Sequence, residues 1–100
     1  MGIEKNTKPI TQIDPKTGQK GTTIPDGIKD GRTVEIKNVQ KQSLTKQLRL
    51  QEKSSVKNGK RPILRINKDA NLSEPLRYSN FEIQTYTITI PFRYDDTTNQ

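Results

Sequence analysis

The sequence predicts a single α/β domain, with a mixed β-sheet and a flanking helix, from three observations. Several short segments alternate with the two-residue period of β-strands, and they lie on both sides of one segment with helical spacing. Isoleucine, which favours strands, supplies 11 of the 22 Leu, Ile, Val and Phe residues. The chain has 100 residues without an internal repeat or a linker, so we expect one thin core for residues 1–100.

The N-terminal part of the chain predicts strands and turns. Residues 7–24 fit a β-hairpin, and the segment 14–18 between its strands contains the proline and the glycine that a turn favours. The pairs Asp26-Gly27 and Asp30-Gly31 indicate two further turns. The first helix is therefore expected only after these segments.

The clearest strand prediction is residues 33–39, where apolar and polar side chains alternate. Val34 and Ile36 are expected on one face of this strand. Glu35 and Lys37 share the other face, because side chains two residues apart point in the same direction. The acidic and the basic side chain are therefore expected to be neighbours in space.

One helix is expected from Ser43 to about Lys57, where Asn58-Gly59 ends it, because glycine adopts the left-handed conformation that follows a helix end. The apolar face of this helix is weak. Spacings of three and four residues instead gather four basic side chains into one stripe. We call this set the basic stripe: Lys46, Arg49, Lys53 and Lys57. It is interpreted either as a phosphate-binding surface or as a solvated or packing face of the helix.

The C-terminal third predicts two strands separated by a polar connection. Residues 63–67 form a short strand, and residues 69–80 form the connection, which has room for a short helical turn. Residues 81–92 form a long strand whose end or edge is marked by Pro91. Residues 94–100 are expected to be a mobile tail.

The composition excludes several classes of catalytic site. The chain contains no cysteine, so disulfides and thiolate metal sites are excluded. It contains no histidine, which excludes Ser/His/Asp catalysis, histidine-based ribonuclease chemistry and most zinc sites. No membrane segment or targeting segment is visible in the sequence. An enzyme with this composition must work with carboxylates and lysine.

The net charge of +7 is unevenly distributed. Residues 37–68 contain ten basic residues and one acidic residue, a local charge of +9, whereas the first 36 residues carry +1 and the last 32 carry −3. Such a basic stretch is typical of a surface that binds a polyanion, with a solvated surface as the alternative. Tyrosines are not spaced as a base-stacking platform, so contacts should be made to the backbone. The candidate contacts are Lys41, Lys46, Arg49, Lys53 and Lys57.

Three residues form a candidate catalytic constellation. Asp26 and Glu35 are two carboxylates that are able to hold a divalent ion such as Mg²⁺ or Mn²⁺, which phosphodiester hydrolysis needs. Lys37 lies beside Glu35 and is able to orient the attacking water or neutralise charge on the phosphoryl group. Taken singly, Asp26 also fits an ordinary turn, and the other two fit the solvated face of a strand.

Four segments carry a resemblance to a known superfamily: Lys5-Asn6-Thr7-Lys8, Ile24-Pro25-Asp26-Gly27, Glu35-Ile36-Lys37-Asn38-Val39 and Ser43-Leu44-Thr45-Lys46-Gln47-Leu48-Arg49. Their order over residues 5–67 resembles the PD-(D/E)XK superfamily, which has the restriction-endonuclease-like fold. The match is closer to the toxin domains of this superfamily that lie at the C-termini of bacterial polymorphic toxins.

The resemblance implies a nuclease that is delivered as part of a larger toxin into the cytoplasm of a competing bacterium. It also implies a divalent metal and a cognate immunity protein, which we expect to be acidic and to cover the basic stripe. By position it assigns Asp26 and Glu35 to the metal, Lys37 to catalysis and Gln47 to the edge of the site.

The chain departs from the family pattern at two places. Such domains usually have a core helix upstream that carries another acidic residue, and this N-terminal helix is expected to be missing here, which leaves Glu4 as the acidic candidate. The toxin helix also commonly continues with aspartate where this chain has Leu50. A trimmed chain or a divergent member would explain both departures.

The sequence thus predicts a metal-dependent endonuclease that cleaves DNA. An RNA-cleaving toxin, for example one acting on tRNA, would use the same residues and is the first alternative. The second alternative is a basic nucleic-acid-binding or assembly module without catalysis, whose binding would weaken with salt and be indifferent to a chelator.

Overall fold

The computed structural model describes residues 5–87. Eight strands and two helices occur in this range, in the following order: β1 (Ile10–Ile13), β2 (Lys20–Thr23), β3 (Gly27–Lys29), β4 (Arg32–Lys37), β5 (Lys41–Gln42), α1 (Lys46–Lys57), β6 (Ile63–Asn67), β7 (Asn71–Leu72), α2 (Glu74–Arg77) and β8 (Glu82–Tyr86).

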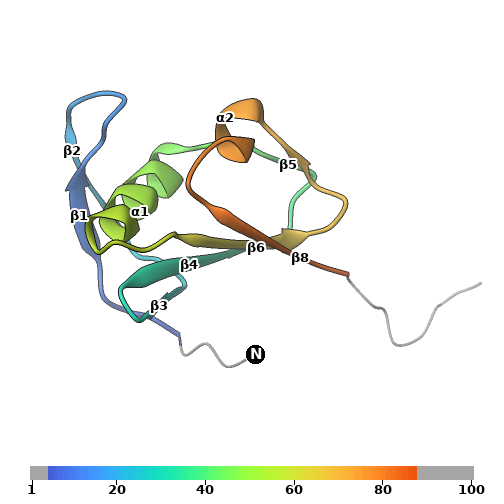
Figure 1. The fold of residues 1–100 in the computed structure, drawn as a ribbon, viewed down its shortest axis with the longest axis horizontal. Helices are drawn as coiled ribbons and strands as arrows, with labels where there is room; N and C mark the ends of the chain where they lie inside the picture. Colours follow the sequence, from blue (N-terminus) through green and yellow to red (C-terminus); the bar gives the residue numbers. More distant parts are fainter. Residues whose placement is uncertain (1–4, 88–100) are drawn as a thin grey trace, which may run out of the picture.

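A mixed four-stranded sheet is the centre of the fold. Its strand order is β3-β4-β6-β8, with β3 antiparallel to β4 and the other neighbours parallel. Parallel neighbours need crossover connections, which contain α1 between β4 and β6 and α2 between β6 and β8. Both helices lie on the same side of the sheet (Figure 1). This arrangement confirms the predicted fold class.

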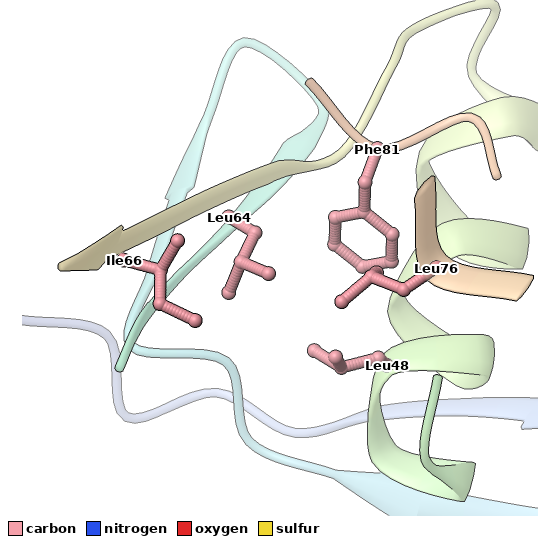
Figure 2. Packing of buried hydrophobic residues seen from close by; sticks show 5 residues of the cluster. All are labelled: Leu48, Leu64, Ile66, Leu76 and Phe81. Atoms are coloured by element: carbon pink, nitrogen blue, oxygen red, sulfur yellow. The ribbon is translucent and has the colours of Figure 1, made fainter. Parts of the chain in front are cut away.

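The hydrophobic core fills the space between the sheet and the two helices. Leu48 of α1 and Leu76 of α2 face Leu64 and Ile66 of β6, and Phe81 closes the same cluster (Figure 2). All five side chains are at most 3% exposed. Burying an aliphatic or aromatic side chain contributes roughly 1.5–3 kcal/mol. This small cluster therefore fixes the helices against one face of the sheet.

The turn between β3 and β4 was predicted correctly, but β3 itself was not. Asp30 and Gly31 have φ angles of 54° and 82°, so both central residues are left-handed, as in the two-residue turns that suit β-hairpins. Gly27, which was expected in a turn, is instead the first residue of β3 and pairs with Val34. Asp26 lies in the bend immediately before it.

Helix α1 starts three residues later than predicted. Ser43 is not its first residue, because residues 41–42 form the short strand β5, which pairs with β7. The cap is Thr45, whose side chain accepts a hydrogen bond from the backbone N–H of Leu48. The predicted end is confirmed, since the helix stops at Lys57 and Gly59 adopts a φ of +71°.

The C-terminal third follows the predicted order. The strand at residues 63–67 is confirmed, and the polar connection after it contains β7 and the single helical turn α2. Strand β8 confirms the first part of the strand expected over residues 81–92. Residues 88–92 with Pro91, the tail 94–100 and Glu4 lie outside the described residues.

The hairpin formed by β1 and β2 confirms the prediction for residues 7–24 and packs against α1. Gly21 lies so close to the helix that an added Cβ would be 2.8 Å from Cε of Lys46 and 2.9 Å from Cδ1 of Leu50. A larger residue would displace one of these side chains. No helix within residues 5–87 is long and apolar enough to cross a membrane.

Candidate active site

Glu35 points from the middle of β4 towards α1. The strand alternation places Glu35 and Lys37 on the helix-facing side, whereas Ile36 is 39% exposed on the opposite side. Glu35 is only 4% exposed, although it carries a carboxylate. The reading of Glu35 as part of a solvated strand face is therefore wrong.

Four donors surround the Glu35 carboxylate. Oε1 accepts from the backbone N–H of Asp26 at 3.3 Å and from Nε2 of Gln51 at 3.0 Å. Oε2 accepts from Nε2 of Gln47 at 3.3 Å and lies 3.6 Å from Nζ of Lys37. Because a buried carboxylate is costly without donors, these contacts explain how Glu35 is tolerated inside the fold.

Asp26, in the bend before β3, is hydrogen-bonded to the same part of β4. Its Oδ2 accepts from the backbone N–H of Ile36 at 2.8 Å, while its own backbone N–H donates to Glu35. The bend before β3 therefore brings the Asp26 side chain to the strand residue that follows Glu35. The structure thus brings Asp26, Glu35, Lys37 and Gln47 together as predicted from the sequence.

Two of the four residues of the basic stripe are engaged within the fold. Arg49 donates from Nε and Nη2 to the two carboxylate oxygens of Asp14, both at 2.8 Å, and from Nη1 to the carbonyl of Leu44. Lys53 donates to the carbonyl of Ile13 at 3.0 Å. Arg49 and Lys53 therefore belong to the face of α1 that packs against the β1–β2 hairpin.

This packing removes Arg49 from the candidate nucleic-acid contacts. Asp14 is fully buried, so the ion pair is a structural contact between the hairpin and α1. The hydrogen bonds from Arg49 hold the pKa of Asp14 well below its usual range, and in return Asp14 raises the pKa of Arg49. Both residues stay charged together. The exposed members of the predicted set are Lys41, Lys46 and Lys57.

Comparison with known proteins identifies the family. A family model, Tox-REase-7, described as restriction endonuclease fold toxin 7, matches residues 2–76. The chain belongs to this family. No curated protein and no solved structure matches the chain. The Tox-REase-7 match confirms the resemblance drawn from the sequence motifs. It makes the chain a nuclease toxin domain whose substrate is nucleic acid.

One residue of the candidate site was not predicted from the sequence. Gln51 follows Gln47 by four residues on α1, so both amides lie on the face of the helix that meets β4. Gln51 is fully buried and makes the shortest hydrogen bond to Glu35. The four-residue spacing of two glutamines opposite a predicted acidic strand residue was the available signal.

The donors present in this Tox-REase-7 domain fit a hard divalent cation. No group of three or more His, Cys, Asp or Glu side chains suited to a metal occurs within residues 5–87. Mg²⁺ is commonly held by one or two carboxylates together with waters and substrate phosphates, so Asp26 and Glu35 are the residues that would hold it. Both contacts to Oε2 of Glu35 are longer than an ordinary hydrogen bond, so this oxygen can turn to a cation.

Proposed function

We propose that this domain is a Mg²⁺- or Mn²⁺-dependent endonuclease that cleaves DNA through Asp26, Glu35 and Lys37. The buried Glu35 carboxylate carries the proposal. It sits in a strand–helix interface that could have been apolar, and it is held there by Lys37, Gln47 and Gln51. Burying a carboxylate destabilises a fold, so a buried carboxylate in a nuclease toxin domain is a strong candidate for a functional group.

Each residue has a role that follows from its position. Asp26 and Glu35 would hold the ion, which when bound polarises the scissile phosphate and lowers the pKa of an attacking water. The Lys37 side chain is 28% exposed and lies beside Oε2 of Glu35, so its ammonium group is able to reach both the site and the substrate. There it would orient the water or stabilise negative charge that develops on the phosphoryl oxygens.

The exposed lysines support binding to the nucleic-acid backbone. Lys41, Lys46 and Lys57 remain exposed, and Lys46 precedes the site residue Gln47 in the chain. Contacts of lysine with phosphates carry little sequence information, so we expect weak sequence preference. RNA offers the same backbone charge, and the substrate test must therefore include both polymers.

A cleavage assay tests the proposal. Plasmid DNA and total RNA are incubated side by side with the wild-type chain, with Asp26→Ala and with Lys37→Ala, in Mg²⁺ and in EDTA. We expect fragments of DNA only with the wild-type chain and Mg²⁺. Equal cleavage by all three proteins, or cleavage that persists in EDTA, would refute the site. If metal-dependent fragments appear from RNA alone, the substrate is RNA and not DNA.

The proposal extends to the biological setting. A nuclease toxin endangers the cell that makes it, so we propose delivery into the cytoplasm of a target bacterium and an acidic immunity protein in the producer. The charge of +9 over residues 37–68 supports an acidic partner. Because Arg49 is engaged with Asp14, this partner is expected over Lys41, Lys46 and Lys57. An acidic neighbour protein that binds without blocking cleavage would contradict this.

A further inference from the structure

Gln51 has an arrangement that folding alone does not explain. Its side chain is fully buried, and Nε2 donates to Oε1 of Glu35 at 3.0 Å. Its own Oε1 is buried without a hydrogen-bond partner among residues 5–87. A buried acceptor without a donor is destabilising, so packing alone does not account for an amide at this position.

The orientation of the Gln51 amide is determined by the carboxylate. Turning the amide over would place its oxygen against Oε1 of Glu35, and two acceptors would then repel each other. The unpartnered oxygen of Gln51 is therefore the consequence of donating to Glu35.

We propose that Gln51 is a positioning residue that sets the direction of the Glu35 carboxylate and leaves its own oxygen unpartnered in doing so. The inference rests on the proposed nuclease function. By holding Oε1, Gln51 leaves Oε2 near the partly exposed Lys37 side chain. Gln47 makes a longer contact at 3.3 Å and acts on that second oxygen. The two glutamines thus hold different oxygens of one carboxylate.

The test replaces Gln51 by methionine, which has similar length and no hydrogen-bonding amide. We expect Gln51→Met to change the thermal midpoint little, because the hydrogen bond lost by Glu35 is offset by removal of the unpartnered oxygen. We expect kcat on DNA to fall roughly 10–100-fold with KM for DNA nearly unchanged, as for residues that orient a metal ligand. Calorimetric titration with Mn²⁺ in the absence of DNA should show weaker binding by a similar factor.

The matched control is Gln42→Met. Gln42 is also a buried glutamine, but it donates to the backbone carbonyl of Ser43 and does not contact Glu35. It should leave kcat and Mn²⁺ binding unchanged.

Three results would overturn the inference. A fall in thermal midpoint that parallels the fall in activity of Gln51→Met would show a merely structural role. Full activity and full Mn²⁺ binding by Gln51→Met, with an inactive Glu35→Gln protein, would reject the role of Gln51 while the nuclease site stands. Full activity of Glu35→Gln would reject the proposed function and this inference together.

Discussion

At the residue scale, the site depends on how the fold compensates one buried carboxylate. Within residues 5–87, Glu35 has one counter-charge, Lys37 at 3.6 Å, and receives its other donors from two amides and a backbone N–H. The Lys37 ammonium group is partly exposed and only loosely paired. It is therefore free to follow the charge of a substrate, which a tightly paired lysine would not be.

We expect Lys37→Met to lower kcat for DNA cleavage by about 10²–10³-fold, because it removes a donor to charge that develops in the transition state. KM should change little, since we expect Lys37 to interact only weakly with the phosphate of the bound substrate before the reaction. Steady-state kinetics on plasmid DNA measures both parameters. A variant that raises KM and leaves kcat unchanged would show that Lys37 only binds substrate.

Residues of the strand were easier to predict than residues of the helix. Strand alternation placed Glu35 and Lys37 together correctly, because the two-residue period depends on local geometry alone. The roles of Arg49 and Gln51 depend on which elements pack on each face of α1, and the helical period cannot show this. The buried Asp14 looked like a turn residue for the same reason.

At the element scale, polar groups determine how α1 sits on β4. The backbone N–H of Thr33 donates to Oγ of Ser55 at 2.9 Å, and both residues are buried. The acceptor of this N–H therefore belongs to helix α1 and not to a neighbouring strand. The contact holds the C-terminal half of α1 at β4 and so helps to keep Gln47 and Gln51, in the N-terminal half, opposite Glu35.

We expect Ser55→Ala to destabilise the domain by about 1–3 kcal/mol, because it leaves the buried N–H of Thr33 without an acceptor. Ser54→Ala is the control on the same helix and should change the free energy of unfolding by less than about 0.5 kcal/mol. Urea denaturation followed by circular dichroism measures both. Equal effects of the two substitutions would contradict this account of the helix position.

The second element-scale contact is the ion pair that joins the β1–β2 hairpin to α1. Its contribution depends on pH, because the pKa of Asp14 is lower in the folded chain than in the unfolded chain. Stabilisation by the pair is therefore complete above the usual pKa range of aspartate. It is lost progressively as the pH falls below about 4, because Asp14 then takes up a proton in the unfolded chain while the folded chain still keeps the carboxylate ionised.

We expect Asp14→Asn to be clearly less stable than wild type at pH 7, and this difference to shrink as the pH is lowered below about 4. Denaturation curves at several pH values measure the difference. The pKa of Glu82 is also lowered, by hydrogen bonds from Gln84 and Arg32, but this affects both proteins equally. A difference that does not depend on pH would contradict the role given to the charged pair.

At the scale of the whole molecule, the charge distribution should govern binding more than catalysis. Two of the basic residues behind the local charge of +9 over residues 37–68, Arg49 and Lys53, bond to groups within the fold. Fewer phosphate contacts are therefore available than the sequence suggests. Each lysine that does contact a phosphate should contribute about 0.9 to the slope of log K against log salt.

We expect Lys46→Ala and Lys57→Ala, made in the inactive Glu35→Gln background, each to lower the salt slope of DNA binding by about 1. Lys29→Ala is the control, since Lys29 is an exposed lysine on β3 that lies outside residues 37–68. Fluorescence anisotropy at several salt concentrations measures the slopes. An equal effect of Lys29→Ala would show that DNA binding depends on the total charge of the domain and not on contacts made by particular lysines.

The most direct measurement of the central claim is plasmid cleavage by the wild-type chain and by Glu35→Gln over a series of Mg²⁺ concentrations, with folding checked by thermal denaturation. We expect cleavage that rises with Mg²⁺ for the wild-type chain and none at any concentration for a folded Glu35→Gln protein. Equal cleavage by the two proteins, or wild-type cleavage that is independent of Mg²⁺, would contradict a metal-dependent site at Glu35.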